Sequence, residues 1–165
     1  MGKNLVICCD GTNQQFSRVN TNVVHLFKAI VRHSEAQKAF YSPGVGTFAA
    51  PFFGFNVGRL LGRLLGMAFG YGIEQNMAEA YRFLMNEYEP GDRVYLFGFS
   101  RGAFAARSLA SMIDRCGILY PHHHNMVREV TRRYMRGDSG AKLRDFRATF
   151  ARPCQPHLVL SLIHI

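Results

Sequence analysis

The segment Gly98-Phe99-Ser100-Arg101-Gly102 matches the pattern Gly-x-Ser-x-Gly, which carries the nucleophilic serine of many hydrolases. The apolar run Arg93 to Phe99 precedes it and predicts a strand, whereas Ala103 to Asp114 follows it and predicts a helix. Strand, sharp turn and helix in this order are the setting of a nucleophile elbow. A tight turn with only a structural role is the alternative interpretation.

Each residue of this turn has an expected task. We predict that Ser100 is the nucleophile, with its hydroxyl lifted above the sheet by the turn. Gly98 and Gly102 are expected where a Cβ would collide with neighbouring backbone. The backbone N–H of Arg101 begins the following helix and is expected to face a developing oxyanion.

A second oxyanion donor is expected from a loop at the carboxyl end of another strand. Asp10-Gly11-Thr12 follows the apolar run Lys3 to Cys9, so the N–H groups of Gly11 and Thr12 are the candidates. For Asp10 we expect a carboxylate that fixes this loop by accepting backbone N–H groups. A simple Asx turn and a role as the acid of a catalytic triad are its alternatives.

The elements that position these residues alternate between strand and helix patterns. This alternation predicts an α/β fold with a mainly parallel sheet flanked by helices. Further strands are expected at Ala39 to Ser42, before Pro43-Gly44, and from Pro156 to Leu160, the latter buried. Helices are expected from Asn20 or Thr21 to about His33, then at Ile73 to Tyr88, His122 to Met135 and Ala141 to Phe150.

Glycine recurs every four residues from Gly54 to Gly70, among Phe, Leu and Met. We expect this segment to form a loop and helix that pack on the sheet, with a lipid-facing lid or a membrane span as alternatives. Arg59 and Arg63 interrupt the run, which disfavours a span.

The 165 residues carry a formal charge of +9 and 48% apolar residues, which is typical of one globular domain. Neither Cys-x-x-Cys nor separated metal ligands occur, so we expect no metal and no cofactor. The basic stretch Arg128 to Arg152 has no recognised nucleic-acid motif, so nucleic-acid binding is disfavoured and anionic lipid is the preferred partner. No secretory signal is evident, which predicts synthesis in the cytoplasm.

Four strings make the chain resemble a known family: CDGTNQ, YSPGVGT, NMAEAYRFLMNEYEPGDRVYLFGFSRGAFAARSLA and CGIL. They resemble the α/β hydrolases of the type VI secretion phospholipase effector kind over roughly residues 3 to 157. The resemblance implies an α/β-hydrolase fold, a Ser-Asp-His triad with Ser100 as nucleophile, and phospholipid acyl esters or small esters as substrates. It also suggests export by a dedicated secretion system and a secretion or immunity partner.

The resemblance stops near the end of the chain. The family's acid follows an apolar-apolar-Gly-Val-Trp-Asp strand, whereas this chain has no Trp and no Asp after Asp145. We therefore expect residues 1–159 to be an amino-terminal part of the hydrolase domain, with the acid and the histidine missing. Residues 160–165, Leu-Ser-Leu-Ile-His-Ile, are expected to be a non-native tail read from a sequencing adapter. A catalytically incomplete module that binds a membrane or a partner is the alternative function.

Overall fold

A four-stranded parallel sheet organises the computed structural model, which describes residues 2–12, 20–44 and 74–162. Its strand order is β2-β1-β3-β6, and every neighbouring pair is parallel. The strands are β1 (Asn4–Thr12), β2 (Gln37–Gly44), β3 (Arg93–Phe99) and β6 (Leu158–Leu162). The predicted mainly parallel sheet flanked by helices is therefore confirmed.

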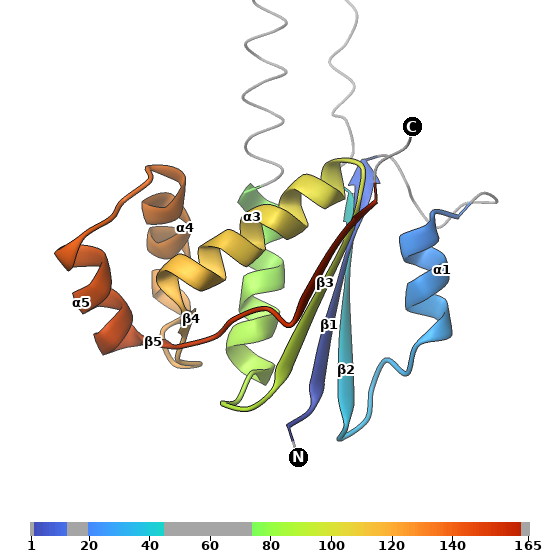
Figure 1. Cartoon of the computed structure of the whole chain (residues 1–165), viewed down its shortest axis with the longest axis horizontal. Helices are drawn as coiled ribbons and strands as arrows, with labels where there is room; N and C mark the ends of the chain where they lie inside the picture. The colour runs from blue at the N-terminus through green and yellow to red at the C-terminus, as the bar shows by residue number, and fades with distance from the viewer. Residues whose placement is uncertain (1, 13–19, 45–73, 163–165) are drawn as a thin grey trace, which may run out of the picture.

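Helices cover both faces of this sheet (Figure 1). The helix α1 (Asn22–Ala29) lies on one face, while an unlabelled helix at 74–87 and α3 (Arg101–Cys116) lie on the other. Successive residues of β1 accordingly enter two cores: Leu5 and Ile7 join the larger one, whereas Val6 and Cys8 pack toward α1. Burial on both faces explains why β1 reads as a continuous apolar run.

The first helix is shorter than its sequence pattern predicts. Thr21 caps it, since its side-chain oxygen accepts a hydrogen bond from the Val24 N–H at 3.2 Å. The helix ends at Ala29 rather than near His33, because Ile30 is extended and His33 forms an isolated bridge with Lys38. The apolar periodicity past residue 29 therefore belongs to a turn that leads into β2.

Two strands extend beyond their predicted ends. β1 continues through Asp10 to Thr12 with a register shift after Cys9, so these residues form an irregular strand end rather than a separate loop. β2 continues through Pro43, although we expected this proline to stop the strand. Proline is tolerated there because β2 lies at an edge of the sheet that the described residues form, where none of these strands needs its missing N–H.

A second layer packs outside α3. It contains β4 (Ile118–Leu119), a 3₁₀ turn at His124–Met126, α4 (Val127–Met135), α5 (Ala141–Phe150) and β5 (Ala151–Arg152). The strands β4 and β5 pair antiparallel, and apolar residues of both helices join the larger core. The predicted helix at His122 to Met135 is thus replaced over its first residues by a loop and the 3₁₀ turn.

The last strand corrects another expectation. The sequence predicts that β6 is buried, but it lies at the sheet edge of the described residues, with Leu158 42%, Val159 38% and Leu160 41% exposed. Leu160 and Leu162 lie within the expected tail, and both pair with β3. The described part of residues 160–165 therefore continues the sheet.

The glycine-rich segment falls at 45–73, outside the described residues. Among the described residues, no helix is both long enough and apolar enough to cross a bilayer.

Arg152 joins the second layer to the main core. Its guanidinium donates hydrogen bonds to the carbonyl oxygens of Tyr88, Met85 and Leu119, the last two at 2.8 and 2.9 Å. It also lies over the Tyr88 and Tyr120 rings, at 5.5 and 5.7 Å from their centroids. Burial lowers the pKa of the Arg152 guanidinium, because it removes water from the charged form. The hydrogen bonds and ring contacts stabilise the side chain in this buried position.

We predict that Arg152→Met lowers the free energy of unfolding by about 2–4 kcal/mol, because three buried carbonyl groups lose their donor. Urea denaturation measures the change. Arg144→Met is the matched control, since Arg144 is exposed on α5, and it should change stability by less than about 0.5 kcal/mol. Equal denaturation midpoints for the two variants would refute the anchoring role of Arg152.

Candidate active site

Ser100 occupies a strained turn between β3 and α3. Its φ of 54° and ψ of −120° make it the one non-glycine residue with positive φ in the described part of the chain. The backbone is nevertheless held on both sides: the Ser100 N–H donates to the Leu162 carbonyl at 2.9 Å, and the Ser100 carbonyl accepts from the Ala103 N–H at 3.0 Å. Such strain persists where the surrounding structure enforces it. The residue itself is exposed.

The two flanking glycines allow this turn. A Cβ on Gly98 would lie 2.4 Å from the Gly102 carbonyl oxygen and 2.5 Å from the Ala103 Cα. A Cβ on Gly102 would lie 2.2 Å from the carbonyl oxygen of Cys9, in β1. All these contacts are with backbone atoms, so no side chain can be accommodated at either position without moving β3, α3 or β1.

The end of β1 lies directly beside the serine. A Cβ on Gly11 would approach the Ser100 Cβ to 3.2 Å, so a larger residue would crowd the Ser100 side chain. The Gly11 N–H donates to Asp10 Oδ1 at 2.8 Å. The sequence predicts that the Gly11 N–H is an oxyanion donor. Because this N–H already donates to a carboxylate, it is less available for that role than expected.

Asp10 is the centre of a buried hydrogen-bond network. Besides the Gly11 N–H, it accepts a hydrogen bond at Oδ2 from the Thr21 hydroxyl at 2.9 Å and from the Tyr41 hydroxyl at 2.7 Å. The carboxylate therefore ties the end of β1 to the start of α1 and to β2, while being only 1% exposed. Both of its oxygens are used by local donors, which suits a residue that fixes the loop better than a triad acid.

Thr21 and Tyr41 are hydrogen-bond donors to Asp10 that the sequence alone does not identify. The sequence pattern identifies Thr21 only as a helix cap, whereas it both caps α1 and donates to Asp10. Tyr41 is only part of a strand pattern in the sequence, and pairing with Cys8 brings it beside the end of β1. Burial raises the pKa of Tyr41, and its hydrogen bond to Asp10 raises it further, so the phenol stays protonated and donates.

The histidines at the far end of α3 do not supply a base to Ser100. α3 has 16 residues, which spans about 24 Å, and His122 to His124 follow β4 beyond its far end. There His122 stacks on Tyr120, and His123 contacts the Phe150 ring edge at a centroid distance of 5.3 Å. The described contacts of His122 and His123 are therefore with aromatic rings at this end of α3, away from Ser100.

The other described histidines are also separated from the elbow or turned outward. The His157 N–H donates to the Val94 carbonyl at 2.7 Å, six residues before Ser100 along β3, or about 20 Å away. His33 bridges to Lys38, whose strand partner is Leu5 near the start of β1. His25 is exposed on α1. No group of three or more His, Cys, Asp or Glu residues able to hold a metal occurs within 2–12, 20–44 and 74–162.

The cysteines of this chain are buried thiols of low reactivity. Burial raises the pKa of Cys8 and of Cys9 to about 12, and that of Cys116 to about 11. Burial also raises the pKa of Cys154. All four thiols are buried and unpaired by disulfides, so a new exposed thiol would react against a low background.

We predict that Ser100→Cys creates a reactive thiolate. Backbone N–H groups at the start of α3 favour the anion, so its pKa should fall at least about one unit below the ordinary 8.5 of a free cysteine. The pH dependence of iodoacetamide alkylation measures this value. Ser111→Cys, exposed in the middle of the same helix, is the control with an ordinary pKa. Equal midpoints would show that the turn does not stabilise negative charge at position 100.

Comparison with known proteins assigns most of this chain to a family. Residues 3–154 match the family described as the type VI secretion system phospholipase effector Tle1-like catalytic domain. The matched range contains Ser100, Asp10 and both elbow glycines.

One curated protein is also similar to this chain. The uncharacterised protein YEL023C of Saccharomyces cerevisiae is 40% identical over 138 residues, which cover 77% of this chain and 20% of that protein. The chain thus spans about a fifth of the relative's length. No solved structure matches significantly. From the match over residues 3–154, the chain belongs to the family of Tle1-like phospholipase effector catalytic domains.

Proposed function

We propose that this chain carries the nucleophile of a serine hydrolase that cleaves acyl esters of phospholipids. The observation that carries the proposal is the strained, exposed Ser100 between β3 and α3, with the end of β1 packed against it. Membership of a phospholipase effector family supports a lipid substrate. An α/β-hydrolase fold, and export with a secretion or immunity partner, belong to the same proposal.

In the proposed reaction, the Ser100 Oγ attacks the ester carbonyl and its proton passes to a base. The carbonyl oxygen becomes an oxyanion, and the proposed donor that stabilises it is the backbone N–H of Arg101, the first residue of α3. The backbone N–H of Thr12 is the second candidate donor. The Gly11 N–H already donates to Asp10, so it contributes only if its hydrogen bond is shared between this carboxylate and the oxyanion. Collapse of the intermediate breaks the ester C–O bond, and the base returns the proton to the leaving alcohol. Water then releases the fatty acid from Ser100.

The base and its acid partner are proposed to lie outside the described residues. Five described histidines lie far along α3 or at the opposite end of the sheet, and His25 faces solvent. Without a base, the rate typically falls by about 10⁶, and the oxyanion donors alone retain roughly 10³–10⁴ over the reaction in water. A binding module without catalysis is the competing proposal, favoured by this same separation of histidines from Ser100.

Added imidazole tests both the nucleophile and the separation of the described histidines from it. We predict that a fluorophosphonate labels Ser100 slowly, and that imidazole increases the labelling rate in proportion to its concentration, because it supplies a proton acceptor that no described histidine provides. Mass spectrometry of the labelled peptide locates the adduct. Labelling should disappear in Ser100→Ala and persist in Ser111→Ala, which removes an exposed serine from the same helix.

Two outcomes would change the proposal. Fast labelling without imidazole would show that a histidine of this chain already acts as the base. Absence of labelling with and without imidazole, in a chain that unfolds cooperatively on heating, would reject Ser100 as a nucleophile. Vesicle binding unaffected by Ser100→Ala would then favour the non-catalytic module.

A further inference from the structure

A cavity outside the candidate active site separates two helices of the described structure. It has a volume of about 390 Å³ and lies between the helix at 74–87 and α4. Its lining consists of charged and polar residues with one alanine: Glu74, Gln75, Ala78, Glu79, Arg82, Arg128 and Arg132. Neither Ser100 nor Asp10 is among them, so the cavity is distinct from the elbow.

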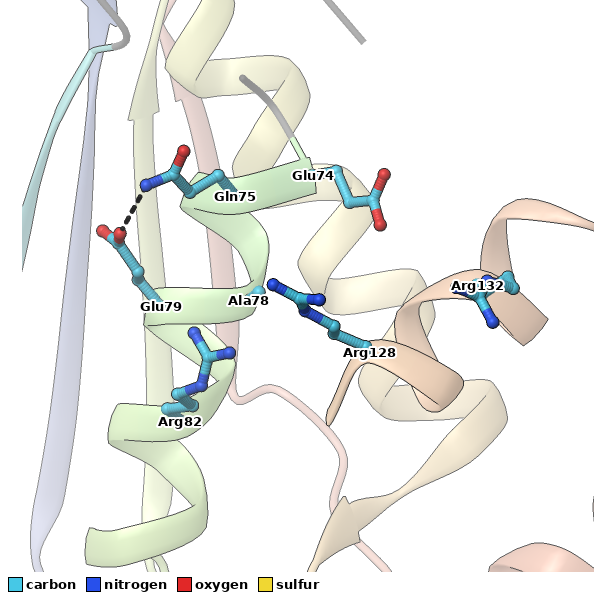
Figure 2. A pocket seen from close by; sticks show the side chains of 7 residues that line it. All are labelled: Glu74, Gln75, Ala78, Glu79, Arg82, Arg128 and Arg132. Carbon is cyan, nitrogen blue, oxygen red and sulfur yellow. Dashed lines mark hydrogen bonds between the residues drawn. The ribbon is translucent and has the colours of Figure 1, made fainter. Parts of the chain in front are cut away.

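Helical spacing explains why these side chains meet. Arg128 and Arg132 are four residues apart and share one face of α4, while Ala78 and Arg82 have the same relation on the facing helix. Figure 2 shows Arg82 and Arg128 reaching toward Ala78 from their two helices. The small Ala78 side chain leaves the space between them open.

Three carboxylates lie near these arginines: Glu129 on α4, and Glu74 and Glu79 on the cavity lining. Glu129 pairs with Arg133 at 2.8 Å and with Arg132 at 3.7 Å. Glu79 accepts a hydrogen bond from Gln75 at 3.2 Å and is turned toward it (Figure 2). Within the described residues, no ion pair involves Arg82 or Arg128.

Two converging guanidinium groups without carboxylate partners form a receptor for a planar or tetrahedral oxyanion. Arginine binds phosphate through parallel N–H···O hydrogen bonds, and two arginines on different helices can hold two edges of one phosphate group. The volume is that of a small-molecule site, large enough for a phosphate with a short organic substituent. The third arginine, Arg132, also lies on the lining, where its ion pair with Glu129 at 3.7 Å partly offsets its charge.

We infer that this cavity binds the phosphate group of a phosphoester, with Arg82 and Arg128 as its ligands. The phosphate comes either from a phospholipid headgroup at a membrane surface or from a soluble phosphoester. Binding does not depend on Ser100, because the two sites share no residue. In the membrane case, this site docks the protein on lipid independently of ester cleavage.

The test uses the whole chain and two probes. Flotation with phosphatidylcholine vesicles that contain phosphatidic acid measures membrane binding, with pure phosphatidylcholine vesicles as the background. Calorimetric titration with glycerol 3-phosphate measures binding of the soluble phosphoester. Binding by vesicles alone identifies the headgroup as the source, whereas binding of glycerol 3-phosphate without vesicle binding identifies the soluble source.

Three variants separate a built site from general positive charge. The double variant Arg82→Gln/Arg128→Gln should weaken binding by at least about tenfold. The matched double variant Arg107→Gln/Arg144→Gln removes the same charge from exposed positions on α3 and α5, and it should retain binding within about threefold. Ala78→Leu keeps the charge but fills the cavity, and it should also weaken binding at least about tenfold.

The result is decisive if circular dichroism shows that the variants stay folded. Equal weakening by the two double variants would overturn the proposal in favour of diffuse electrostatic attraction. Unchanged binding by Ala78→Leu would place the anion outside the cavity and would likewise overturn it. Failure of the folded wild-type chain to bind either probe would also overturn the proposal.

Discussion

The close approach of α3 to the end of β1 is the constraint on which the candidate site depends. At Gly102 a Cβ would lie 2.2 Å from the Cys9 carbonyl oxygen, and at Gly98 it would lie 2.4 Å from the Gly102 carbonyl oxygen. Two strands and a helix therefore converge where side chains are absent. The chain can turn sharply enough to place Ser100 at positive φ only because its neighbours on both sides need so little space.

A buried carboxylate stabilises the other half of the site. Asp10 accepts hydrogen bonds from Gly11, Thr21 and Tyr41, and it thereby fixes β1, α1 and β2 relative to one another. A buried charge is tolerated when several donors satisfy it, and a satisfied network makes the local backbone rigid. This rigidity holds Gly11 against Ser100, and it also occupies the N–H group that the sequence suggested for the oxyanion.

The distribution of positive charge separates structural from recognition roles. Arg152 is buried and used internally by three carbonyl groups, whereas Arg133 is paired with Glu129. Arg82 and Arg128 have no such partners in the described ranges and converge on one cavity. The arginines that contribute to the net charge of +9 therefore have different roles and are not spread as a uniform positive surface.

The elbow, the parallel sheet and the family could all be predicted from the amino-acid sequence. Gly98, Ser100 and Gly102 are recognisable because the steric demands of a tight turn act within a few residues, and β3 has the predicted bounds because its apolar pattern is local. The donors around Asp10 could not be predicted in this way, since Thr21 and Tyr41 reach it through strand pairing and helix docking. Tertiary packing likewise decides the exposure of β6 at an edge of the described sheet. It also brings Arg82 near Arg128, because strand order and helix pairing depend on long-range contacts that no local pattern records.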